Sequence, residues 1–362
     1  MPVLGSGRAA RTYGIVRALA ASGPVDLLHT RFGASEPDPA YQALDGLRLH
    51  AVSSSRGARR GLAWARARTS GVPRAVARGV SPELAAAADA LADGAGRVIA
   101  EDPMAAVALL PLARRRPVIY SAGNLESDFR PGRDPDWGSR RSLQAFERRL
   151  LEAAAEGWLA SRADLDGARE LAPDAELRYV PNVVDVAAIE PRRAPADPPR
   201  ALLVANFGYA PNREGLDFLL EGVMPLVWAA HPRLRLNVVG RGYDPQPGVD
   251  ERVEVLGFVE DLEPLYTQAA CALVPLLSGA GSPVKFIEAL AHGLPVVATP
   301  RAAAGIDGES GCDYLEGDGA EGFAAALLAA LAPERGAAVG AAGRALAESE
   351  HSIEALARRL AA

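Results

Sequence analysis

The sequence contains almost no lysine. Of its 39 basic residues 38 are arginine, and Lys285 is the only lysine among the 362 residues. The two side chains differ most at a tight site for a point charge, which suits a compact ammonium better than a planar guanidinium. An exposed ion pair would accept either residue. The single lysine therefore marks the stretch 278–293, "SGAGSPVKFIEALAHG", as a candidate functional segment.

Cysteines and long apolar runs are also scarce. The two cysteines, Cys271 and Cys312, form no spaced framework, which excludes a disulfide-rich scaffold and fits a reducing compartment. No apolar run approaches 18 residues, so we expect no transmembrane helix. The N-terminus reads "MPVLGSGRAARTYG", with glycine and arginine where a signal peptide has its apolar core. We therefore expect a cytoplasmic protein.

The charge is unevenly distributed along the chain. The net charge is −6, but residues 1–130 hold 17 arginines and 11 acidic residues, whereas the rest hold 22 basic and 34 acidic residues. This asymmetry predicts two lobes with different partners. Basic residues are not interleaved with aromatic ones, and the whole chain is acidic. We therefore expect no nucleic-acid partner.

Short apolar runs alternate along the chain with helical patterns. Most runs are continuous rather than alternating, which favours parallel strands covered on both faces. The predicted strands are 25–29, 47–52, 97–100, 117–120, 157–160, 177–180, 201–205, 234–239, 253–257, 271–275 and 295–299, and the predicted helices include 8–21, 103–113, 138–155, 213–230 and 318–332. This order is typical of doubly wound α/β folds and predicts two Rossmann-like domains.

A proline-rich segment separates the two series of strands. Residues 190–200, "EPRRAPADPPR", hold four prolines and are unsuited to a helix or a central strand. A glycine-rich loop in such a fold follows a first strand, and no full apolar strand precedes Gly5. We expect either a natural start upstream of Met1, which is favoured, or a first domain without this strand. The predicted parts are a first domain 1–188, a linker 189–200, a second domain 201–345 and a C-terminal helix within 346–362 that packs back on the first domain.

The stretch 278–293 predicts a loop followed by a helix. Ser282 is a good N-cap and Pro283 a good first helical residue. A helix N-terminus binds anions, yet Lys285 lies in the first turn, against the preference of the helix dipole. A bound diphosphate would explain this cation, and Glu288 would then accept hydrogen bonds from two ribose hydroxyls. The alternative is an ordinary exposed Lys–Glu pair on an amphipathic helix.

The segment "VPLLSGAGSPVKFIEALAHGLPVVATPRAAAGI" resembles the donor site of the group 1 family of retaining glycosyltransferases. That family has the GT-B fold, two Rossmann-like domains that face a cleft. The branch that this chain resembles reads P-L-x-x-G-G-G-T-x-x-K-x-x-E-A-x-A-x-G-x-P-V-V. Many members have a second glutamate where this chain has Ala280, a difference that the glycine-rich branch tolerates. The matching residues are Pro275, Gly279, Gly281, Ser282, Lys285, Glu288 and Gly293.

Further stretches extend the resemblance over nearly the whole chain. They are "YVPNVVD" (179–185) at the domain junction, "VANFGYAPNREGLDFLLEGVMPLV" at the start of the donor domain, "LGFVEDLEPLY" (256–266) at the nucleotide base and "GSGRAARTYGIVRALAASG" near the diphosphate. The resemblance implies a nucleotide diphosphate sugar as co-substrate, with no metal and no further cofactor. The donor-binding residues that it implies are Gly5, Gly7, Asn206, Val259, Gly279, Gly281, Ser282, Val284, Lys285 and Glu288.

The first domain departs from the family pattern at the reaction centre. The branch carries D-A-H-N-x-E-S, where this chain reads "YSAGNLESDF", so Ser121 and Gly123 replace Asp and His. Arg213 either stands in for the basic pair that holds the diphosphate in the family or is a solvated residue at a helix start. Glu101 and Asp102 are either cleft groups at the carboxyl end of a strand or a helix N-cap pair. The candidate catalytic residues are Lys285, Arg213, Glu126 and Glu101.

The resemblance implies metal-independent sugar transfer, with retention, to a glycan, a lipid-linked molecule or a small molecule. Without the histidine, the leaving phosphate itself would take the acceptor proton while Lys285 stabilises its charge. A catalytically impaired nucleotide-sugar-binding partner of an active transferase is the alternative, and an isomerase of nucleotide sugars is a third. The acidic stretch 307–319 lacks the spacing of a calcium loop, so we expect no metal site.

The region 56–78 is rich in arginine. It reads "RGARRGLAWARARTSGVPRAVAR", and Leu62, Trp64 and Val72 interrupt its basic residues. This pattern fits either peripheral contact with an anionic membrane surface or a solvated helix face.

Overall fold

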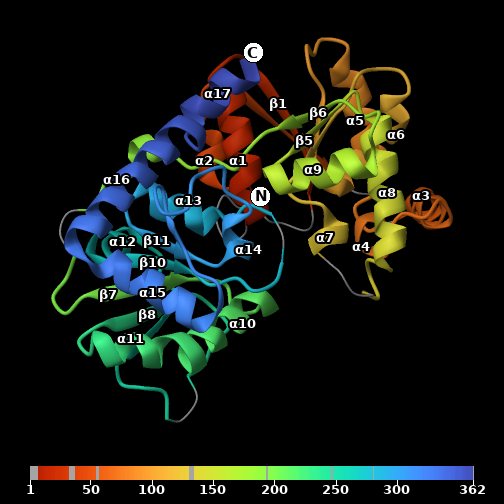
Figure 1. Ribbon diagram of the computed structural model, residues 1–362. Helices are drawn as coiled ribbons and strands as arrows, with labels where there is room; N and C mark the ends of the chain where they lie inside the picture. The colour runs from red at the N-terminus through yellow and green to blue at the C-terminus, as the bar shows by residue number, and fades with distance from the viewer. Residues whose placement is uncertain are drawn as a thin grey trace. The chain divides into compact units, whose positions relative to one another are not determined.

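The computed structural model describes residues 7–31, 37–53, 57–129, 134–192, 195–245, 248–279 and 281–361 (Figure 1). By its internal contacts the chain divides into two compact units. Unit 1 comprises Met1–Asn182 and Leu356–Ala362, and unit 2 comprises Val183–Ala355.

The units divide six residues earlier than the boundary that the sequence predicted, and the predicted linker 189–200 lies in unit 2. Backbone hydrogen bonds attach this segment to unit 2. The N–H of Arg192 donates to the carbonyl of His292 at 2.7 Å, and that of Ala196 donates to the carbonyl of Gln268 at 2.9 Å. Proline removes a donor only at its own position, so the residues between the prolines still form such bonds.

Unit 1 carries two parallel sheets rather than one. The strand orders are β1–β2 and β3–β4–β5–β6, and the described residues contain no strand that joins β1 to β3. The expected single doubly wound sheet is therefore divided. In chain order the elements are α1 (Gly7–Ala20), β1 (Val25–Arg31), α2 (Pro39–Gln42), β2 (Leu47–Ser53), α3 (Ala58–Thr69), α4 (Arg74–Ala77), α5 (Pro82–Ala92), β3 (Ile99–Glu101), α6 (Asp102–Ala113), β4 (Ile119–Ala122), α7 (Glu126–Phe129), α8 (Arg140–Ala153), β5 (Glu156–Leu159), α9 (Arg162–Leu171) and β6 (Leu177–Tyr179).

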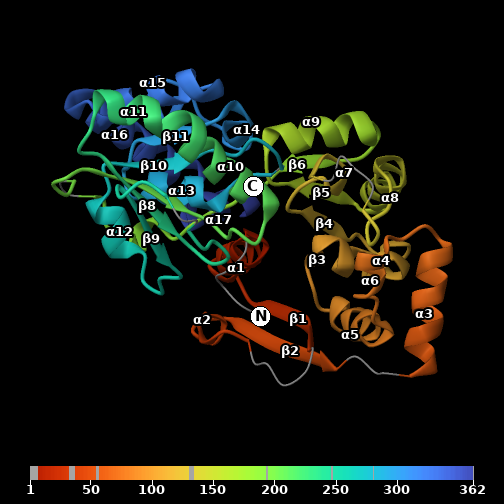
Figure 2. The ribbon, with the colours of Figure 1, turned by 90° about the horizontal axis from the view of Figure 1, so that it is seen from below.

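The core of unit 1 surrounds the four-stranded sheet (Figure 2). All four residues of β4 are buried, as the continuous apolar run predicted for a strand covered on both faces. Helix α8 contributes Leu143, Phe146 and Leu150 to this core from one helical face. Its N-terminus is closed by a capping box between Ser139 and Ser142, so the chain enters the helix with its first N–H groups satisfied.

Unit 2 is built on one six-stranded parallel sheet. The strand order is β12–β11–β10–β7–β8–β9. In chain order the elements are η1 (Val186–Ala188), β7 (Arg200–Val204), α10 (Ala210–Phe218), η2 (Leu219–Val223), α11 (Met224–Ala230), β8 (Arg235–Val239), β9 (Val253–Gly257), α12 (Glu263–Gln268), β10 (Cys271–Val274), α13 (Val284–Ala291), β11 (Val296–Ala298), α14 (Pro300–Ala303), β12 (Leu315–Glu316), α15 (Gly319–Leu331) and α16 (Pro333–Glu350), and α17 (Ile353–Ala361) follows.

Both faces of this sheet are covered by helices. Successive residues of a strand point to opposite faces, and Leu203 accordingly joins a core with α10, α11 and α15, whereas Leu202 joins a core with α12 and α13. The α/β class and the doubly wound pattern are confirmed here. The predicted helix 213–230 is divided into α10, the π-helical turn η2 and α11.

The described helices include no single one that is long and apolar enough to cross a membrane. Helices α15 and α16 meet that length and composition only as a pair, bent by 94° at the break between them.

Candidate donor site

The loop between β10 and α13 is held in place by side chains from three directions. Ser278 donates its hydroxyl to a carboxylate oxygen of Glu214 at 2.6 Å. The Thr299 hydroxyl donates to the carbonyl of Leu276, and the Arg301 guanidinium donates to the carbonyl of Gly279. The sequence singled out neither Thr299 nor Arg301, because both lie about 20 residues beyond the loop that they bind.

Glycine is required at two positions of this loop. Gly279 and Gly281 have φ angles of 94° and 88°, a region that side chains other than glycine rarely adopt. The loop also approaches another backbone closely, because a Cβ atom at Gly305 would clash with the carbonyl oxygen of Gly281. The glycines of the motif thus give the loop its path to the N-terminus of α13.

Helix α13 begins one residue later than the sequence predicted. Its first residue is Val284, and Pro283 is the N-cap, with extended backbone and no side-chain capping bond. Ser282 is therefore not the N-cap that was expected. A proline N-cap leaves the first N–H groups of the helix to other acceptors, which suits an anion better than a capped terminus does.

Lys285 lies in the first turn of α13 and is partly buried. Its Nζ donates a hydrogen bond to Oδ1 of Asn212, on α10, at 2.8 Å. In the described part of the chain no carboxylate lies within ion-pair distance of Nζ. Burial alone lowers the pKa of Lys285 to about 8. The side chain is thus a desolvated cation whose protein partner is a neutral amide.

Glu288 lies one turn after Lys285 and has a different partner. The Tyr266 hydroxyl donates to Oε2 of Glu288 at 3.3 Å. Burial raises the pKa of Glu288, and the hydrogen bond from Tyr266 opposes that shift. Both Lys285 and Glu288 are partly buried, and no ion pair joins them in the described residues. The alternative of an exposed Lys–Glu pair therefore does not describe this helix.

The ring of Tyr266 packs against a second aromatic ring. It stacks on the imidazole of His292, with ring centroids 4.3 Å apart and an interplanar angle of 7°. His292, directly after the last residue of α13, is 3% exposed. Burial lowers its pKa to about 4, so the ring is neutral at pH 7. Tyr266 and His292 together position the Glu288 carboxylate, and sequence reasoning missed both.

Arg213 does not approach Lys285 through any contact of the described structure. Its guanidinium donates to the carbonyl of Phe207 at 3.0 Å and to that of Gly242 at 3.4 Å, and so joins two loops at the carboxyl ends of β7 and β8. Asn206 closes a turn in the same loop, because its Oδ1 accepts the N–H of Gly208 at 3.0 Å. As donor ligands Arg213 and Asn206 stay predictions.

Asn212 connects that loop to the lysine. Its Nδ2 donates to the carbonyl of Asn206 at 2.8 Å, while its Oδ1 accepts from Lys285. The amide is thereby oriented with its oxygen toward the ammonium. The sequence reasoning chose the adjacent Arg213 because it sought a positive charge, and passed over the neutral residue beside it.

The predicted base-binding loop follows β9. Val259 is half-buried and packs on the core, whereas its neighbour Phe258 is 60% exposed. The Arg241 guanidinium lies over the Phe258 ring, 3.9 Å from its centroid. Both residues follow the carboxyl ends of β8 and β9, the edge at which parallel sheets place ligands. The sequence analysis did not predict this cation–π contact between Arg241 and Phe258 at the carboxyl edge of the sheet.

The candidates of unit 1 are joined by two arginines of α1. Arg8 contacts the carboxylates of Asp102, at 2.7 Å, and Glu126. Arg11 lies 3.5 Å from Oε1 of Glu101 and also donates to the Ser121 hydroxyl. Gly5 lies outside the described residues, and Gly7 is the first residue of α1.

Glu126 is 1% exposed and is surrounded by partners. Besides Arg8, the carboxylate of Glu147 accepts the backbone N–H of Glu126. Burial raises the pKa of Glu147 to about 7. Asp102 has a φ of 76°, the one left-handed residue other than glycine in the described backbone, and such residues cluster at functional sites. The catalytic roles of Glu126 and Glu101 stay predictions.

Gly123, which replaces the family histidine, has free space beside it. A Cβ atom built there meets only the Cδ of Arg11 at 3.6 Å, an ordinary contact. The position therefore has room for a Cβ atom, and a clash at Cβ does not explain why glycine stands there.

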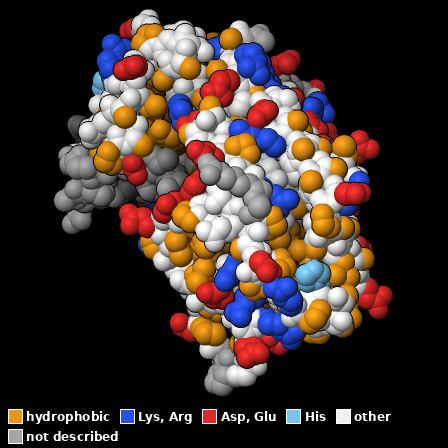
Figure 3. Space-filling model, turned by 90° about the vertical axis from the view of Figure 1, so that its left-hand side faces the viewer, with side chains coloured by type: hydrophobic (Ala, Val, Ile, Leu, Met, Phe, Trp, Pro, Cys, Tyr) orange, Lys and Arg blue, Asp and Glu red, His pale blue; other side chains and the backbone are white. Residues whose placement is uncertain are grey.

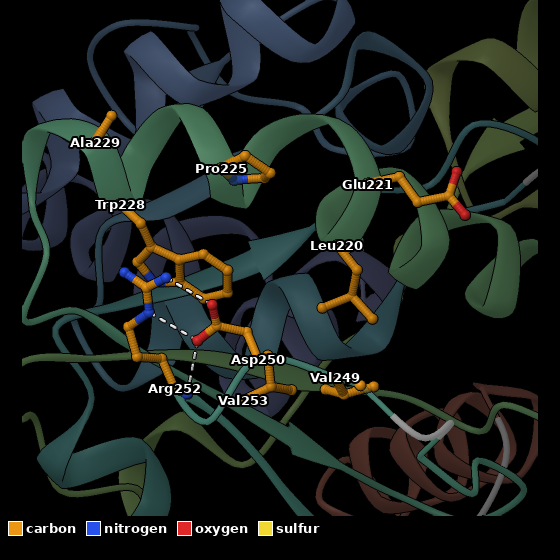
Figure 4. A pocket seen from close by; sticks show the side chains of 10 residues that line it. Leu220, Glu221, Pro225, Trp228, Ala229, Val249, Asp250, Arg252 and Val253 are labelled. Atoms are coloured by element: carbon orange, nitrogen blue, oxygen red, sulfur yellow. Dashed lines mark hydrogen bonds and ion pairs between the residues drawn. The ribbon is translucent and has the colours of Figure 1, made fainter.

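A cavity of about 690 Å³ on unit 2 lies apart from these residues. Figure 4 shows Arg252 held by Asp250 beside the ring of Trp228, with Leu220 and Glu221 further along. The Arg252 guanidinium lies 4.1 Å from the Trp228 centroid. None of the predicted donor residues lines this cavity, and its ion pair is internally satisfied.

Comparison with known proteins agrees with this geometry. The family model described as "Glycosyl transferases group 1" matches residues 198–332. A GDP-mannose-dependent monoacylated alpha-(1-6)-phosphatidylinositol monomannoside mannosyltransferase of Corynebacterium glutamicum is 33% identical over 165 residues, which cover 41% of this chain and 43% of that protein. The match thus spans less than half of the curated relative.

The fold resembles solved structures along its whole length. Sucrose-phosphate synthase from Thermosynechococcus elongatus superposes with a TM-score of 0.72 at 18% identity, covering 99% of this chain and 92% of that one. Anabaena HepE in complex with UDP-glucose superposes with a TM-score of 0.65 at 13% identity, covering 100% and 96%. These likenesses confirm the GT-B fold. Residues 198–332, which carry the lysine-bearing loop and helix and make up less than half of this chain, match the model of the group 1 glycosyltransferases.

Proposed function

We propose that this chain transfers a sugar from a nucleotide diphosphate sugar to a hydroxyl-bearing acceptor, with retention at the anomeric carbon and without a metal or other cofactor. We place the reaction in the cytoplasm, in keeping with two cysteines that are both free. The acceptor is a glycan, a lipid-linked molecule or a small molecule, and its identity depends on unit 1.

The observation that carries the proposal is the state of Lys285. A buried ammonium without an opposing charge is unfavourable, and in the described residues Lys285 has Asn212 as its hydrogen-bond partner. A diphosphate would supply the missing negative charge beside an N-terminus of α13 that has no side-chain cap. Glu288, held by Tyr266, would accept the ribose hydroxyls.

The same arrangement supports bond cleavage. As the glycosidic bond breaks, negative charge grows on the leaving diphosphate, and a cation placed there beforehand stabilises the transition state. A leaving phosphate oxygen on the face of acceptor attack would take the acceptor proton. Retention follows from attack and departure on one face of the sugar, and Lys285 supplies the charge that a metal provides elsewhere.

The first experiment compares nucleotide binding by the parent and by Lys285→Ala. Thermal unfolding is followed with UDP, GDP, ADP and dTDP in turn, because the similar proteins are named for different bases. One nucleotide at a hundred times its dissociation constant should stabilise the parent by roughly 2.7 kcal/mol and leave the variant unchanged. Arg233→Ala removes an exposed guanidinium of unit 2 and is the matched control.

Equal stabilisation of the parent and Lys285→Ala would overturn the proposed donor site. Turnover is tested next with the nucleotide sugar of the base that binds, and the anomeric configuration of the product is read by proton NMR. An inverted product, or loss of activity to a metal chelator, would contradict the mechanism. Tight binding without transfer or donor hydrolysis, and recovery of turnover in Gly123→His, would favour the non-catalytic partner.

A further inference from the structure

Three successive backbone N–H groups at the start of α7 donate to buried carboxylates of two other helices. The N–H of Leu125 donates to Oδ1 of Asp164, on α9, at 3.1 Å. The N–H of Glu126 donates to Oε1 of Glu147, on α8, and that of Ser127 donates to Oε2 of the same carboxylate at 3.2 Å. The first N–H groups of a helix have no partner within it. The course of the chain into α7 therefore depends on these two acidic side chains.

Glu147 accepts these bonds with both of its oxygens, and this requires the ionised form. An ionised carboxylate is an acceptor at both oxygens, whereas a protonated carboxyl carries an O–H donor on one of them. That donor would face the N–H of Glu126 or of Ser127, and two donors do not bond. The remaining bond would also lose the assistance of the charge, which roughly doubles the strength of a hydrogen bond. Protonation of Glu147 thus weakens both contacts of the turn.

No cation pairs with Glu147 in the part of the chain that the structure describes. On the face shown in Figure 3, acidic and basic side chains are interspersed, so surface carboxylates there lie near counter-charges. Glu147 is 2% exposed, and its partners are the two backbone N–H groups and the Ser127 hydroxyl. A buried charge that neutral donors alone stabilise is costly. The fold therefore keeps this carboxyl ionised less readily than a surface carboxyl.

The other charged groups nearby do not remove this cost. The titratable groups that act on Glu147 or on its turn are Glu126 on α7, Tyr120 on β4, Asp102 on α6 and Asp164 on α9. The cations beside them are Arg8 and Arg11 on α1, and in the described residues both pair with other carboxylates. Burial raises the pKa of Glu147 to about 7, while hydrogen bonds from Ser127 and the two N–H groups oppose the shift. The carboxyl therefore changes its protonation state near neutral pH.

The turn that Glu147 holds also carries an ion pair. The Glu126 carboxylate is 1% exposed and contacts the Arg8 guanidinium, which lies 2.7 Å from a carboxylate oxygen of Asp102. Since Glu147 fixes the backbone N–H of Glu126, it also fixes the position from which this carboxylate meets Arg8. The turn follows Gly123, which stands where the resembling branch has histidine. A change at Glu147 thus reaches the segments that follow β3 and β4.

We propose that Glu147 is a pH-dependent switch, whose ionised carboxylate holds the first turn of α7 and whose protonation releases that turn and the contact between Glu126 and Arg8. Asp164 does not fit this role. Its Oδ2 accepts the Ser161 hydroxyl at 2.5 Å, and a hydroxyl can turn to accept from a protonated carboxyl, so the bond from Leu125 survives protonation. These contacts all lie within unit 1, and only an effect of the switch on turnover rests on the proposed function.

The switch is tested first in the parent protein. Carboxyl ¹³C NMR should show the Glu147 carbon titrating with a midpoint near pH 7, and the absence of that signal in Glu147→Gln assigns it. Amide hydrogen exchange of Glu126 and Ser127, corrected for the intrinsic rate, should slow by roughly tenfold or more from pH 6 to pH 8, the scale of a hydrogen bond to a charged group. The N–H of Leu125 should keep its protection at both pH values.

Three variants separate the switch from ordinary packing. Glu147→Gln has one acceptor oxygen and no charge, so the amides of Glu126 and Ser127 should exchange fast at both pH values. Asp164→Asn keeps an acceptor for Leu125 and should show the pH profile of the parent. Glu152→Gln changes an exposed carboxylate on the same helix and is the matched control, with the parental profile expected.

A Glu147 midpoint below pH 5, or equal corrected exchange at pH 6 and pH 8 in the parent, would overturn the switch. So would a pH profile that persists in Glu147→Gln and disappears in Asp164→Asn. The measurements on the parent decide the matter even where a variant fails to fold. Absence of sugar transfer at every pH would contradict the proposed function, whereas the exchange profile would still test the switch.

Discussion

The two arginines of α1 in unit 1 and Lys285 in unit 2 have opposite kinds of partner. In unit 1 Arg11 is 2% exposed and Arg8 is partly buried, and each lies against carboxylates. In unit 2 the partly buried Lys285 meets no carboxylate in the described residues, only the amide of Asn212. Carboxylates thus offset the cost of desolvating Arg8 and Arg11, whereas no carboxylate among the described residues offsets this cost for Lys285.

This contrast separates a structural ion network from a binding site. Breaking a buried pair leaves an uncompensated charge and destabilises the fold, so Arg11 and Glu101 belong to the stability of unit 1. A cation without a counter-charge destabilises the free protein, and a bound anion removes this destabilisation. We therefore assign Lys285 to a binding site. If this contrast holds, substitution of Arg11 lowers the stability of the fold, whereas substitution of Lys285 lowers the affinity for an anion.

The largest effect on stability is expected for Arg11→Met. It would leave the Glu101 carboxylate without its ion pair and the Ser121 hydroxyl and the Val180 carbonyl without their donor. We expect a loss of about 3–5 kcal/mol in the free energy of unfolding, measured by urea denaturation. Arg66→Met, at an exposed arginine that has no partner among the described residues, should change stability by less than about 0.5 kcal/mol. Similar losses in both variants would remove the distinction drawn for unit 1.

The opposite pattern is expected for Lys285→Met. Binding of a nucleoside diphosphate and of inorganic diphosphate should fall by roughly 100-fold or more, the scale of a lost electrostatic contact at a reacting phosphate, measured by calorimetry. The nucleotide-free variant should be at least as stable as the parent at pH 7. A large loss of stability would mean that Lys285 is part of the fold rather than of a binding site.

The pH dependence of binding sharpens this test. Burial lowers the pKa of Lys285 to about 8 from an ordinary value of 10.5, so the cost of holding its charge in the free protein is present below pH 8 and disappears between pH 8 and 10.5. Diphosphate affinity should therefore fall as the pH rises above about 8, by up to tenfold per unit. Lys285→Arg keeps its charge and should flatten the profile. A profile that is flat in the parent would contradict the assignment.

The smallest effect is expected for Tyr266→Phe. The variant removes the hydrogen bond that lowers the pKa of Glu288, so more of this carboxylate is protonated as the pH falls. Nucleoside diphosphate binding should weaken by about five- to tenfold, more strongly at acidic pH. Inorganic diphosphate has no ribose and should bind as it does to the parent. Equal weakening of both ligands would show that Tyr266 supports the loop rather than Glu288.

Much of the fold followed from local pattern. The continuous apolar runs located β1 to β11 closely, because strands buried on both faces exclude polar residues. The sheet of unit 1 was not predicted as two, because pairing depends on which strands meet and not on the residues within each. The start of α13 was misplaced by one residue, since Pro283 took an extended backbone.

The candidate site was predicted unevenly for a related reason. Composition alone singled out Lys285, and the spacing of one helix turn added Glu288. Asn212 and Tyr266, which hold these two side chains, lie 73 and 22 residues away from them in the chain. No periodicity connects residues at such separations.

Local chemistry in the sequence was thus enough to identify the elements, the glycine loop and the residues that bear charge at it. Folding alone set the partner of each charge. Arg8 and Glu126 are 118 residues apart, and whether a carboxylate becomes a site or one half of an ion pair depends on which side chain the fold brings beside it. The energy of a buried charge is set by those neighbours, because in a low dielectric the nearest counter-charge outweighs the intrinsic preference of the residue.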